Sequence, residues 1–178
     1  MAHKLHDNGI IEVDITPEMI TQANVHSEEV ASIKSNDRHS LRKGEGTLIG
    51  SIGELAIKQV YPYWNHSNTF DYDFEYDGIK IDIKTKDRTV PPRLNYEASI
   101  SNYNITQKCD VYMFVSVLRN KSKNNLFEKA YIMGLYMKED YMRDATFLKK
   151  GSIDPSNNWK VGCDCYNLEY SRLETIAP

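Results

Sequence analysis

The sequence predicts a mixed α/β (α+β) fold, in which helices flank a central mixed β-sheet. Residues 70–76 and 79–86 alternate apolar and polar side chains with the period of a strand. The Asp77-Gly78 pair between them is typical of a two-residue hairpin turn. Residues 47–60 instead repeat apolar side chains at helical spacing. Strands that are covered on both faces give nearly continuous apolar runs, and the sequence has two of these, at about 111–118 and 130–137.

A further helix is expected near the N-terminus, because Thr16-Pro17-Glu18 combines an N-cap residue, a proline in the first turn and an acid. We expect this helix to extend to about Ile33. The helix at 47–60 contains small residues near its middle, which predicts that it approaches another element closely. A short helix between 95 and 109 and a last strand within 165–176 complete the expected elements.

Composition excludes several classes of protein. The 178 residues carry 22 Lys and Arg against 25 Asp and Glu, so the net charge of −3 excludes a globally basic nucleic-acid coat, although not a local basic groove. An apolar content of 40% excludes a disordered chain. No apolar stretch approaches the roughly 20 residues of a membrane span, so no membrane partner is expected. Three cysteines, an odd count, predict free thiols and a cytoplasmic setting.

The predicted hairpin places two carboxylates opposite each other. Pairing the strands through the Asp77-Gly78 turn sets Asp73 across from Asp82, with Cβ atoms about 4.5–5.5 Å apart. Two charges at that separation repel by about 3 kcal/mol at an effective dielectric constant of 20. A divalent cation held by both would offset this cost, and oxygen ligands suit Mg²⁺ or Mn²⁺. Lys84 points to the same face, where it can stabilise negative charge. The alternative is an ordinary solvated face of charged residues.

These residues resemble a known family. Asp73 followed by Asp82-Ile83-Lys84, with Glu54 in a Gly-Glu pair on the preceding helix, is similar to the PD-(D/E)xK nuclease superfamily. The resemblance implies a restriction-endonuclease-like sheet flanked by helices and a metal-dependent phosphodiesterase, an endonuclease acting on DNA. It further implies that Asp73, Asp82, the Ile83 carbonyl and Glu54 hold the metal, and that Lys84 acts with the attacking water. Glu54, Asp73, Asp82 and Lys84 are therefore the expected catalytic residues.

The chain departs from the family pattern at one position, because Tyr72 rather than proline precedes Asp73. Asp71 is a rival for the first acid, since it also faces Lys84. Asp73 is preferred because it opposes Asp82. We expect a single domain over 1–178, with a helical segment at 1–43, a catalytic core at 44–137 and a C-terminal extension at 138–178.

Basic and aromatic residues near this site are candidates for contacts with nucleic acid. A proline-stiffened loop leaves directly from the catalytic strand, and loops on a rigid scaffold often carry binding. For any single basic residue, a solvated surface is the alternative interpretation. The candidates that we assign to DNA are Lys43, Lys86, Arg88, Arg93 and Tyr96.

The one remaining motif, a pair of cysteines, gives weaker evidence for a function. Cys163-x-Cys165 lacks the second ligand pair of a structural zinc site, so zinc is not expected.

The first hypothesis for function is a Mg²⁺- or Mn²⁺-dependent DNA endonuclease. The alternative is a non-catalytic nucleic-acid-binding or assembly module on the same fold, and a hydrolase of small phosphoesters is a third hypothesis. A homodimer formed through the helix at 17–33 and a phage-encoded origin, acting in the host cytoplasm, complete the expectations.

Overall fold

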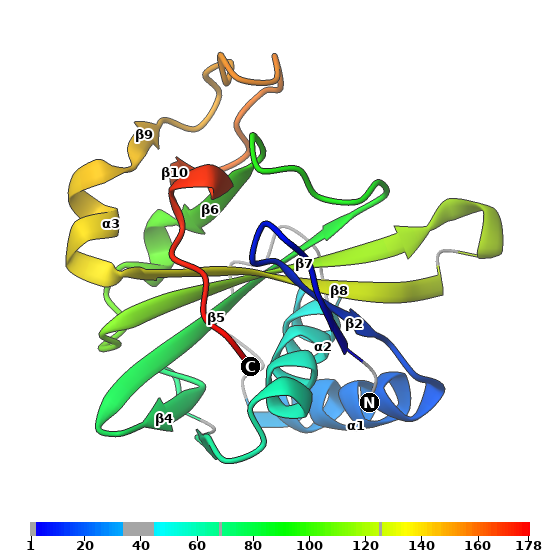
Figure 1. The fold of residues 1–178 in the computed structure, drawn as a ribbon. Coiled ribbons are helices and arrows are strands. Elements are labelled where there is room, and N and C mark those ends of the chain that lie inside the picture. Colours follow the sequence, from blue (N-terminus) through cyan, green and yellow to red (C-terminus); the bar gives the residue numbers. More distant parts are fainter. Residues whose placement is uncertain (1–2, 34–44, 68, 125) are drawn as a thin grey trace.

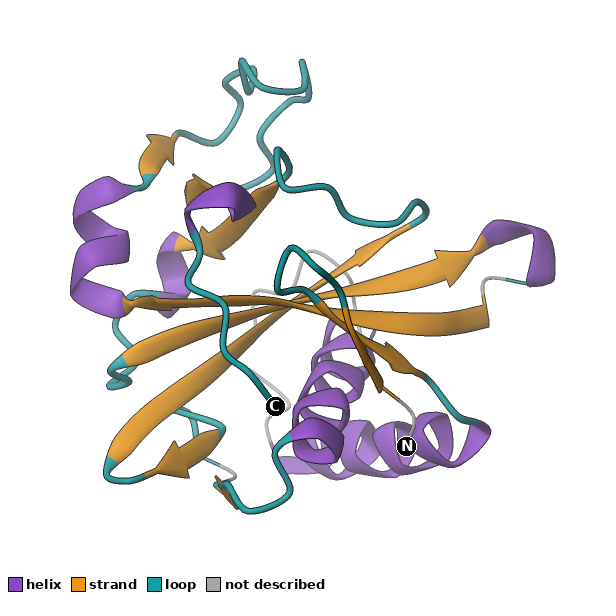
Figure 2. Ribbon diagram, in the orientation of Figure 1, coloured by secondary structure: helices purple, strands orange, loops and turns teal. Residues whose placement is uncertain are grey.

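The computed structural model describes residues 3–33, 45–67, 69–124 and 126–178 (Figure 1). These residues form a mixed α/β fold, which confirms the predicted fold class. A large mixed sheet lies next to a small antiparallel sheet, and Figure 2 shows helices on both sides of the large sheet. The helices are α1 (Pro17–Ile33), α2 (Glu45–Val60) and α3 (Lys138–Asp144).

The described strands build two sheets. The larger has the strand order β1 (His3–Leu5), β2 (Ile11–Asp14), β8 (Leu126–Met137), β7 (Val111–Asn120), β5 (Ile79–Arg88), β4 (Phe74–Tyr76) and β3 (Asn65–His66). The smaller has the order β6 (Glu97–Ser101), β10 (Cys165–Glu169) and β9 (Thr146–Leu148). Only the β5–β7 pair is parallel among the described ladders.

Each face of the large sheet has its own hydrophobic core. One core joins α1 and α2 to side chains such as Ile81 and Ile83 of β5. The other lies under the small sheet and α3 and contains Tyr112, Phe114 and Tyr141. Figure 1 shows α1 and α2 below the large sheet and β6, β9, β10 and α3 above it. Strand β5 is therefore covered on both sides, and its two sets of alternating side chains enter different layers.

Several sequence predictions are confirmed. The first two helices lie at the predicted positions. The predicted close approach of the second helix occurs at Gly53, where an added Cβ would lie 1.9 Å from Oγ1 of Thr85 on β5. The two apolar runs form β7 and β8, and the expected last strand is β10. None of the helices among the described residues is both long and apolar enough to cross a bilayer.

The prediction of a short helix between residues 95 and 109 is wrong. Residues Glu97–Ser101 form β6, and only the short 3-10 helix η1 (Asn102–Asn104) follows it. Ala98 and Ile100 are buried while their neighbours are partly exposed, which is the period-two pattern of a half-buried strand. The partner of this strand is β10, more than sixty residues further along the chain, so a local interpretation could not supply the pairing. Helix α3 and strands β1, β2 and β9 are also additions of the structure.

Candidate metal centre

The hairpin that carries the site has the predicted turn and register. Asp77 and Gly78 both have positive φ, 49° and 78°, as a two-residue turn that follows the twist of the strands requires. Tyr76 pairs with Ile79, and Phe74 pairs with Ile81. Because side chains alternate along β5, Ile81 and Ile83 enter the core beneath α2, whereas Asp82 and Lys84 point to the opposite side.

The regular ladder ends one residue before the predicted carboxylate pair. The N–H of Asp73 donates to the carbonyl of Ile81 at 3.0 Å, which is the residue that also pairs with Phe74. The Asp73 side chain then turns to the neighbouring strand, where its Oδ2 accepts from the N–H of Ile83 at 2.7 Å. The direct Asp73–Asp82 pairing is thus replaced by a side chain bonded to the backbone next to Asp82. The carboxylate takes the position that a backbone carbonyl of a continued strand would occupy.

Asp82 is buried, with 3% of its surface exposed. Its Oδ1 accepts from Nε2 of Gln107 at 3.1 Å, and its Oδ2 lies 2.5 Å from Nζ of Lys84. The Lys84 ammonium is therefore the ion-pair partner of this oxygen. Burial raises the pKa of Asp82, and the nearby Lys84 ammonium only partly opposes this shift. The structure therefore holds a buried carboxylate that pairs with one ammonium and one amide, and burial still disfavours its charged form.

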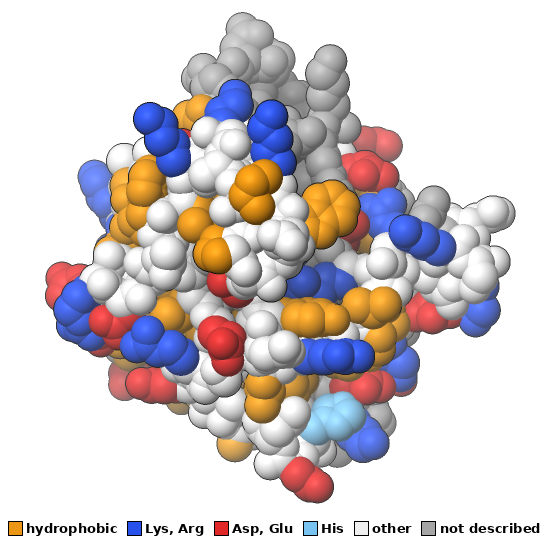
Figure 3. Space-filling view, turned by 90° about the horizontal axis from the view of Figure 1, so that it is seen from above, with side chains coloured by type: hydrophobic (Ala, Val, Ile, Leu, Met, Phe, Trp, Pro, Cys, Tyr) orange, Lys and Arg blue, Asp and Glu red, His pale blue; other side chains and the backbone are white. Residues whose placement is uncertain are grey.

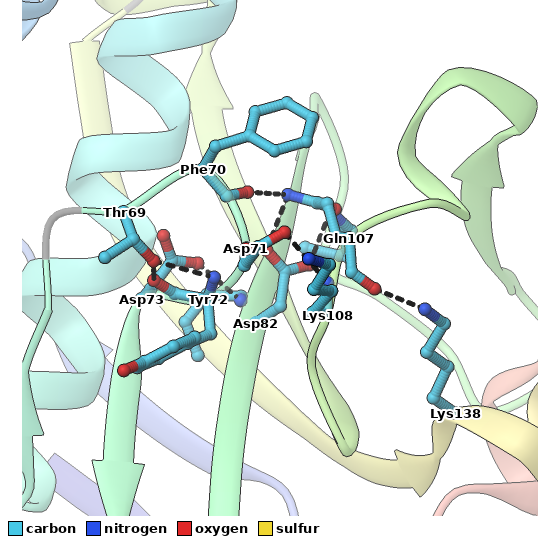
Figure 4. A network of polar contacts seen from close by, with 11 residues as sticks. Thr69, Phe70, Asp71, Tyr72, Asp73, Asp82, Gln107, Lys108 and Lys138 are labelled. Carbon is cyan, nitrogen blue, oxygen red and sulfur yellow. Dashed lines mark hydrogen bonds and ion pairs between the residues drawn. The ribbon is translucent and has the colours of Figure 1, made fainter.

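Gln107 organises the polar side of the site. Its Nε2 donates to the carbonyl of Phe70 at 2.7 Å as well as to Asp82, and its Oε1 accepts from Nζ of Lys84 at 2.7 Å. Lys138, at the start of α3, binds the Gln107 carbonyl (Figure 4). Sequence reasoning missed Gln107, because no motif spacing links it to the hairpin. Its position in an interior amide network fixes both members of the Asp82–Lys84 pair.

Glu54 reaches the site from α2, which runs beside Asp73 in Figure 4. Burial raises the pKa of Asp73 well above its usual range, and the negative charges of Glu54 and then of Asp82 raise it further. Glu54 also bonds to Nε2 of His66 at 3.1 Å. The carboxylates of Glu54, Asp73 and Asp82 thus act on one another electrostatically, although they come from a helix, a loop and a strand.

The rival acid is engaged elsewhere. Asp71 accepts a hydrogen bond from the N–H of Lys108 at 3.0 Å, so its carboxylate anchors the segment that carries Gln107 (Figure 4). Asp73 instead contacts the backbone of β5 beside Asp82. The position of Asp73 therefore favours it as the first acid.

The four described residues that were assigned to DNA divide into two groups. Arg88 is used inside the protein: it donates to Ser116, Tyr170 and the Glu97 carbonyl and lies over the ring of Tyr96 at 4.9 Å. Arg88 and Tyr96 therefore join β5 to the small sheet. Lys86 and Arg93 are exposed and remain accessible to a ligand. Lys43 lies outside the described residues.

The oxygen atoms of this site are of the chemical type that hard divalent cations bind. Mg²⁺ and Mn²⁺ prefer carboxylate and carbonyl oxygens, and the site offers the carboxylates of Glu54, Asp73 and Asp82. Within the described part of the chain, however, no three His, Cys, Asp or Glu side chains already stand at ligating distances from one point. A cation held by these carboxylates would require their side chains to rotate, and Asp82 Oδ2 would exchange its contact with Lys84 for the cation.

Comparison with known proteins adds no identification to this geometry. No protein-family model matches the sequence, and a search of curated proteins finds no match either. The resemblance to the PD-(D/E)xK superfamily stays a prediction from the residues of the hairpin and α2.

Proposed function

We propose that this protein is a metal-dependent nuclease that hydrolyses phosphodiester bonds, acting as an endonuclease on DNA. The observation that carries the proposal is the buried ion pair of Asp82 and Lys84, which lies beside two further carboxylates, Asp73 and Glu54, that repel Asp82 and each other. Carboxylates that are buried close together are disfavoured in the charged form unless enough positive charge offsets them. The charge arrangement therefore favours a site that a cation completes.

In this proposal Asp73 and Asp82 hold Mg²⁺ or Mn²⁺, with Glu54 and the Ile83 carbonyl as further ligands. The bound cation supplies neutralisation of the phosphate and a more acidic water. Lys84, positioned by Gln107, stabilises the charge that develops on the phosphate oxygens. Hydrolysis adds water across one P–O ester bond and releases a phosphomonoester and a hydroxyl group.

Cleavage of a mixed panel of substrates tests the proposal. Supercoiled plasmid, linear duplex, single strand and a branched junction are incubated with Mg²⁺, Mn²⁺ or EDTA. We expect metal-dependent products, reduced on the order of 10²–10³-fold or more in Asp82→Ala and in Lys84→Ala. Asp71→Asn is the matched control, because its carboxylate binds the Lys108 N–H, and it should cleave nearly as well as wild type. Equal cleavage by wild type and Asp82→Ala would exclude this site, and binding without any cleavage would favour the non-catalytic module.

The wider setting is part of the same proposal. The three cysteines are free, which suits a reducing cytoplasm such as that of a phage-infected host. A homodimer through α1 would have to use its outer face, because Met19 and Ala23 on the inner face are buried in the core.

A further inference from the structure

A projecting loop connects β9 to β10, and we call residues 149–164 the wing. Its two arms are joined by backbone hydrogen bonds from Gly151 to Val161, from Val161 to Ser152 and from Asp154 to Trp159, each of 2.8 Å. Figure 1 shows the wing above β10, on the side of the large sheet that faces away from α1. This ladder gives the wing a defined shape, although it lies outside both hydrophobic cores.

The base of the wing is fixed to the small sheet by a buried carboxylate. Asp154 is 6% exposed and accepts from the N–H and Oγ of Ser156 at 2.9 and 2.8 Å. Nδ2 of Asn157 donates to Asp154 at 3.1 Å, while Nδ2 of Asn167 donates to Glu97 at 2.9 Å and to Asp154 at 3.4 Å. Because Asn167 lies on β10 and Glu97 on β6, these bonds set the wing's orientation on the sheet.

The wing presents a tryptophan to solvent. Trp159 is 76% exposed, whereas the chain's other tryptophan, Trp64, is 9% exposed and stacks on Tyr61. The backbone of Trp159 is held on both sides, because its N–H donates to Asn157 Oδ1 at 2.9 Å and its carbonyl accepts from Asp154. Large aromatic surfaces gain free energy on leaving water. The exposed indole of Trp159, on a hairpin of defined shape, can therefore bind a partner that has an apolar or aromatic face.

The charges around this tryptophan are positive. Lys149, Lys150 and Lys160 are exposed, and none of them forms a salt bridge within the described residues. The two acids of the wing face inward: Asp154 is buried, and Asp164 accepts from the N–H of Lys150 at 2.7 Å. Figure 3 looks down on this end of the molecule and shows basic and hydrophobic side chains beside one another. The whole chain has a net charge of −3, so this local excess of lysines is a distinct positive surface. Together with Trp159 it favours binding of a polyanion that also carries aromatic rings.

The wing is connected to the candidate metal centre along β5. Lys86 lies on the same face of the strand as Asp82 and Lys84, about 13 Å beyond Asp82 at 3.3 Å per residue. Nζ of Lys86 donates to Oγ of Ser99 on β6 at 3.3 Å. Two residues before Ser99, Glu97 accepts from Ser156 of the wing at 3.0 Å. Both surfaces thus border the same stretch of the molecule.

We propose that the wing is a second nucleic-acid contact, in which Trp159 stacks on an unpaired base while Lys149, Lys150 and Lys160 contact the backbone phosphates. This inference deepens the proposed nuclease function by naming the substrate class. The interior of a duplex offers no base face for stacking, so the preferred substrate contains a single-stranded segment, as a free strand, a flap or a junction does.

Tryptophan fluorescence in EDTA, where metal-dependent cleavage is blocked, tests the contact directly. A single-stranded oligonucleotide and the matched duplex are titrated into the full chain. We expect quenching by the single strand, weaker quenching by the duplex, and loss of the signal in Trp159→Phe with binding retained. Trp159→Ala should weaken single-strand binding by about 5- to 150-fold, the range that one stacked base contributes. Tyr63→Ala, which removes a 62% exposed aromatic side chain beyond α2, is the matched control.

Salt dependence tests the lysines separately. Each phosphate contact on single-stranded nucleic acid contributes about 0.7 to the slope of log K against log salt concentration. Lys160→Gln should lower the slope by about that amount. Lys121→Gln, on the exposed turn between β7 and β8, should leave the slope unchanged.

Four results would overturn the inference, and two of them come from the titrations. One is the absence of quenching by any nucleic acid, and the other is equal quenching by heparin, which would indicate charge without base stacking. An effect of Trp159→Ala on self-association, with unchanged nucleic-acid affinity, would equally assign the wing to a protein interface. The two proposals fail separately: quenching without cleavage keeps the wing contact, whereas cleavage that is insensitive to Trp159→Ala removes it alone.

Discussion

Two clusters of carboxylates in this protein are built in opposite ways. At the base of the wing, Asp154 receives hydrogen bonds from Ser156, Asn157 and Asn167. Burial raises its pKa, but the bonds from Ser156, Glu97 and Asn157 together outweigh burial, so the pKa is lowered. At the hairpin, burial raises the pKa values of Asp73 and Asp82. The charged form is therefore favoured at Asp154, although burial raises the pKa of its neighbour Glu97, and it is disfavoured at both hairpin carboxylates.

The difference separates a carboxylate whose charged form the protein favours from carboxylates whose charged form it disfavours. Donors around Asp154 stabilise its charged form, so the charge contributes to the fold of the wing. The hairpin carboxylates repel one another and are disfavoured in the charged form, which lowers the stability of the protein without a cation. Such a stability deficit is typical of functional sites.

The largest expected effect is on metal-dependent stability. Mg²⁺ or Mn²⁺ at about 100 times its dissociation constant should stabilise wild type by about 2.7 kcal/mol, which raises the melting temperature by several degrees. Asp82→Asn should lose this shift, and Asp154→Asn should keep it. Differential scanning calorimetry with and without metal measures both. A full shift in Asp82→Asn would mean that the cation binds elsewhere.

A smaller effect is expected on the wing in metal-free buffer. Asp154→Ala removes the common acceptor of three side chains, and the unsatisfied donors should lower the free energy of unfolding by about 1–3 kcal/mol. Urea denaturation measures this change. Asp140→Ala, at an exposed salt bridge with Arg143, is the control and should change stability by less than about 1 kcal/mol. Equal effects of the two substitutions would contradict the anchoring role of Asp154.

The smallest effect concerns Asp73 and has the opposite sign. Asp73→Asn keeps an oxygen for the Ile83 N–H but removes a disfavoured charge, so it should stabilise the metal-free protein by about 1 kcal/mol at neutral pH. Because the folded-state pKa of Asp73 is raised, the folded state binds more protons, and the wild-type penalty disappears as pH falls toward the usual value of 3.8. The advantage of Asp73→Asn should therefore shrink on acidification. The contribution of Asp154, whose pKa is lowered, is instead lost as pH falls through that lower value.

Thermal unfolding of wild type and Asp73→Asn between neutral pH and about pH 4, in EDTA, follows this trend. An advantage that stays constant over the range would show that the effect of the substitution does not come from the charge of Asp73.

Local pattern was enough to predict the turn and the three pairs next to it, because Asp77-Gly78 and strict alternation define both within a few residues. The predicted strand over 70–76 and its Asp73–Asp82 pair were wrong, because the strand begins only at Phe74. Local pattern placed Asp82 and Lys84 on one face because of the same alternation. It could not predict Gln107, which meets them only after the chain has passed through the small sheet. The internal role of Arg88 was missed likewise, since its partner Tyr170 lies 82 residues away.

The contact between Gly53 and Thr85 has a consequence for the next residue along α2. Since an added methyl group would collide with Thr85 at 1.9 Å, the missing side chain of Gly53 sets how near the helix axis comes to β5. Glu54 is fixed to the helix and Asp82 to the strand, so the helix–strand distance also sets the distance between these two acids. The distance between Glu54 and Asp82 therefore depends on position 53 carrying only a hydrogen atom. A larger residue there would push α2 away from β5 and separate the two carboxylates.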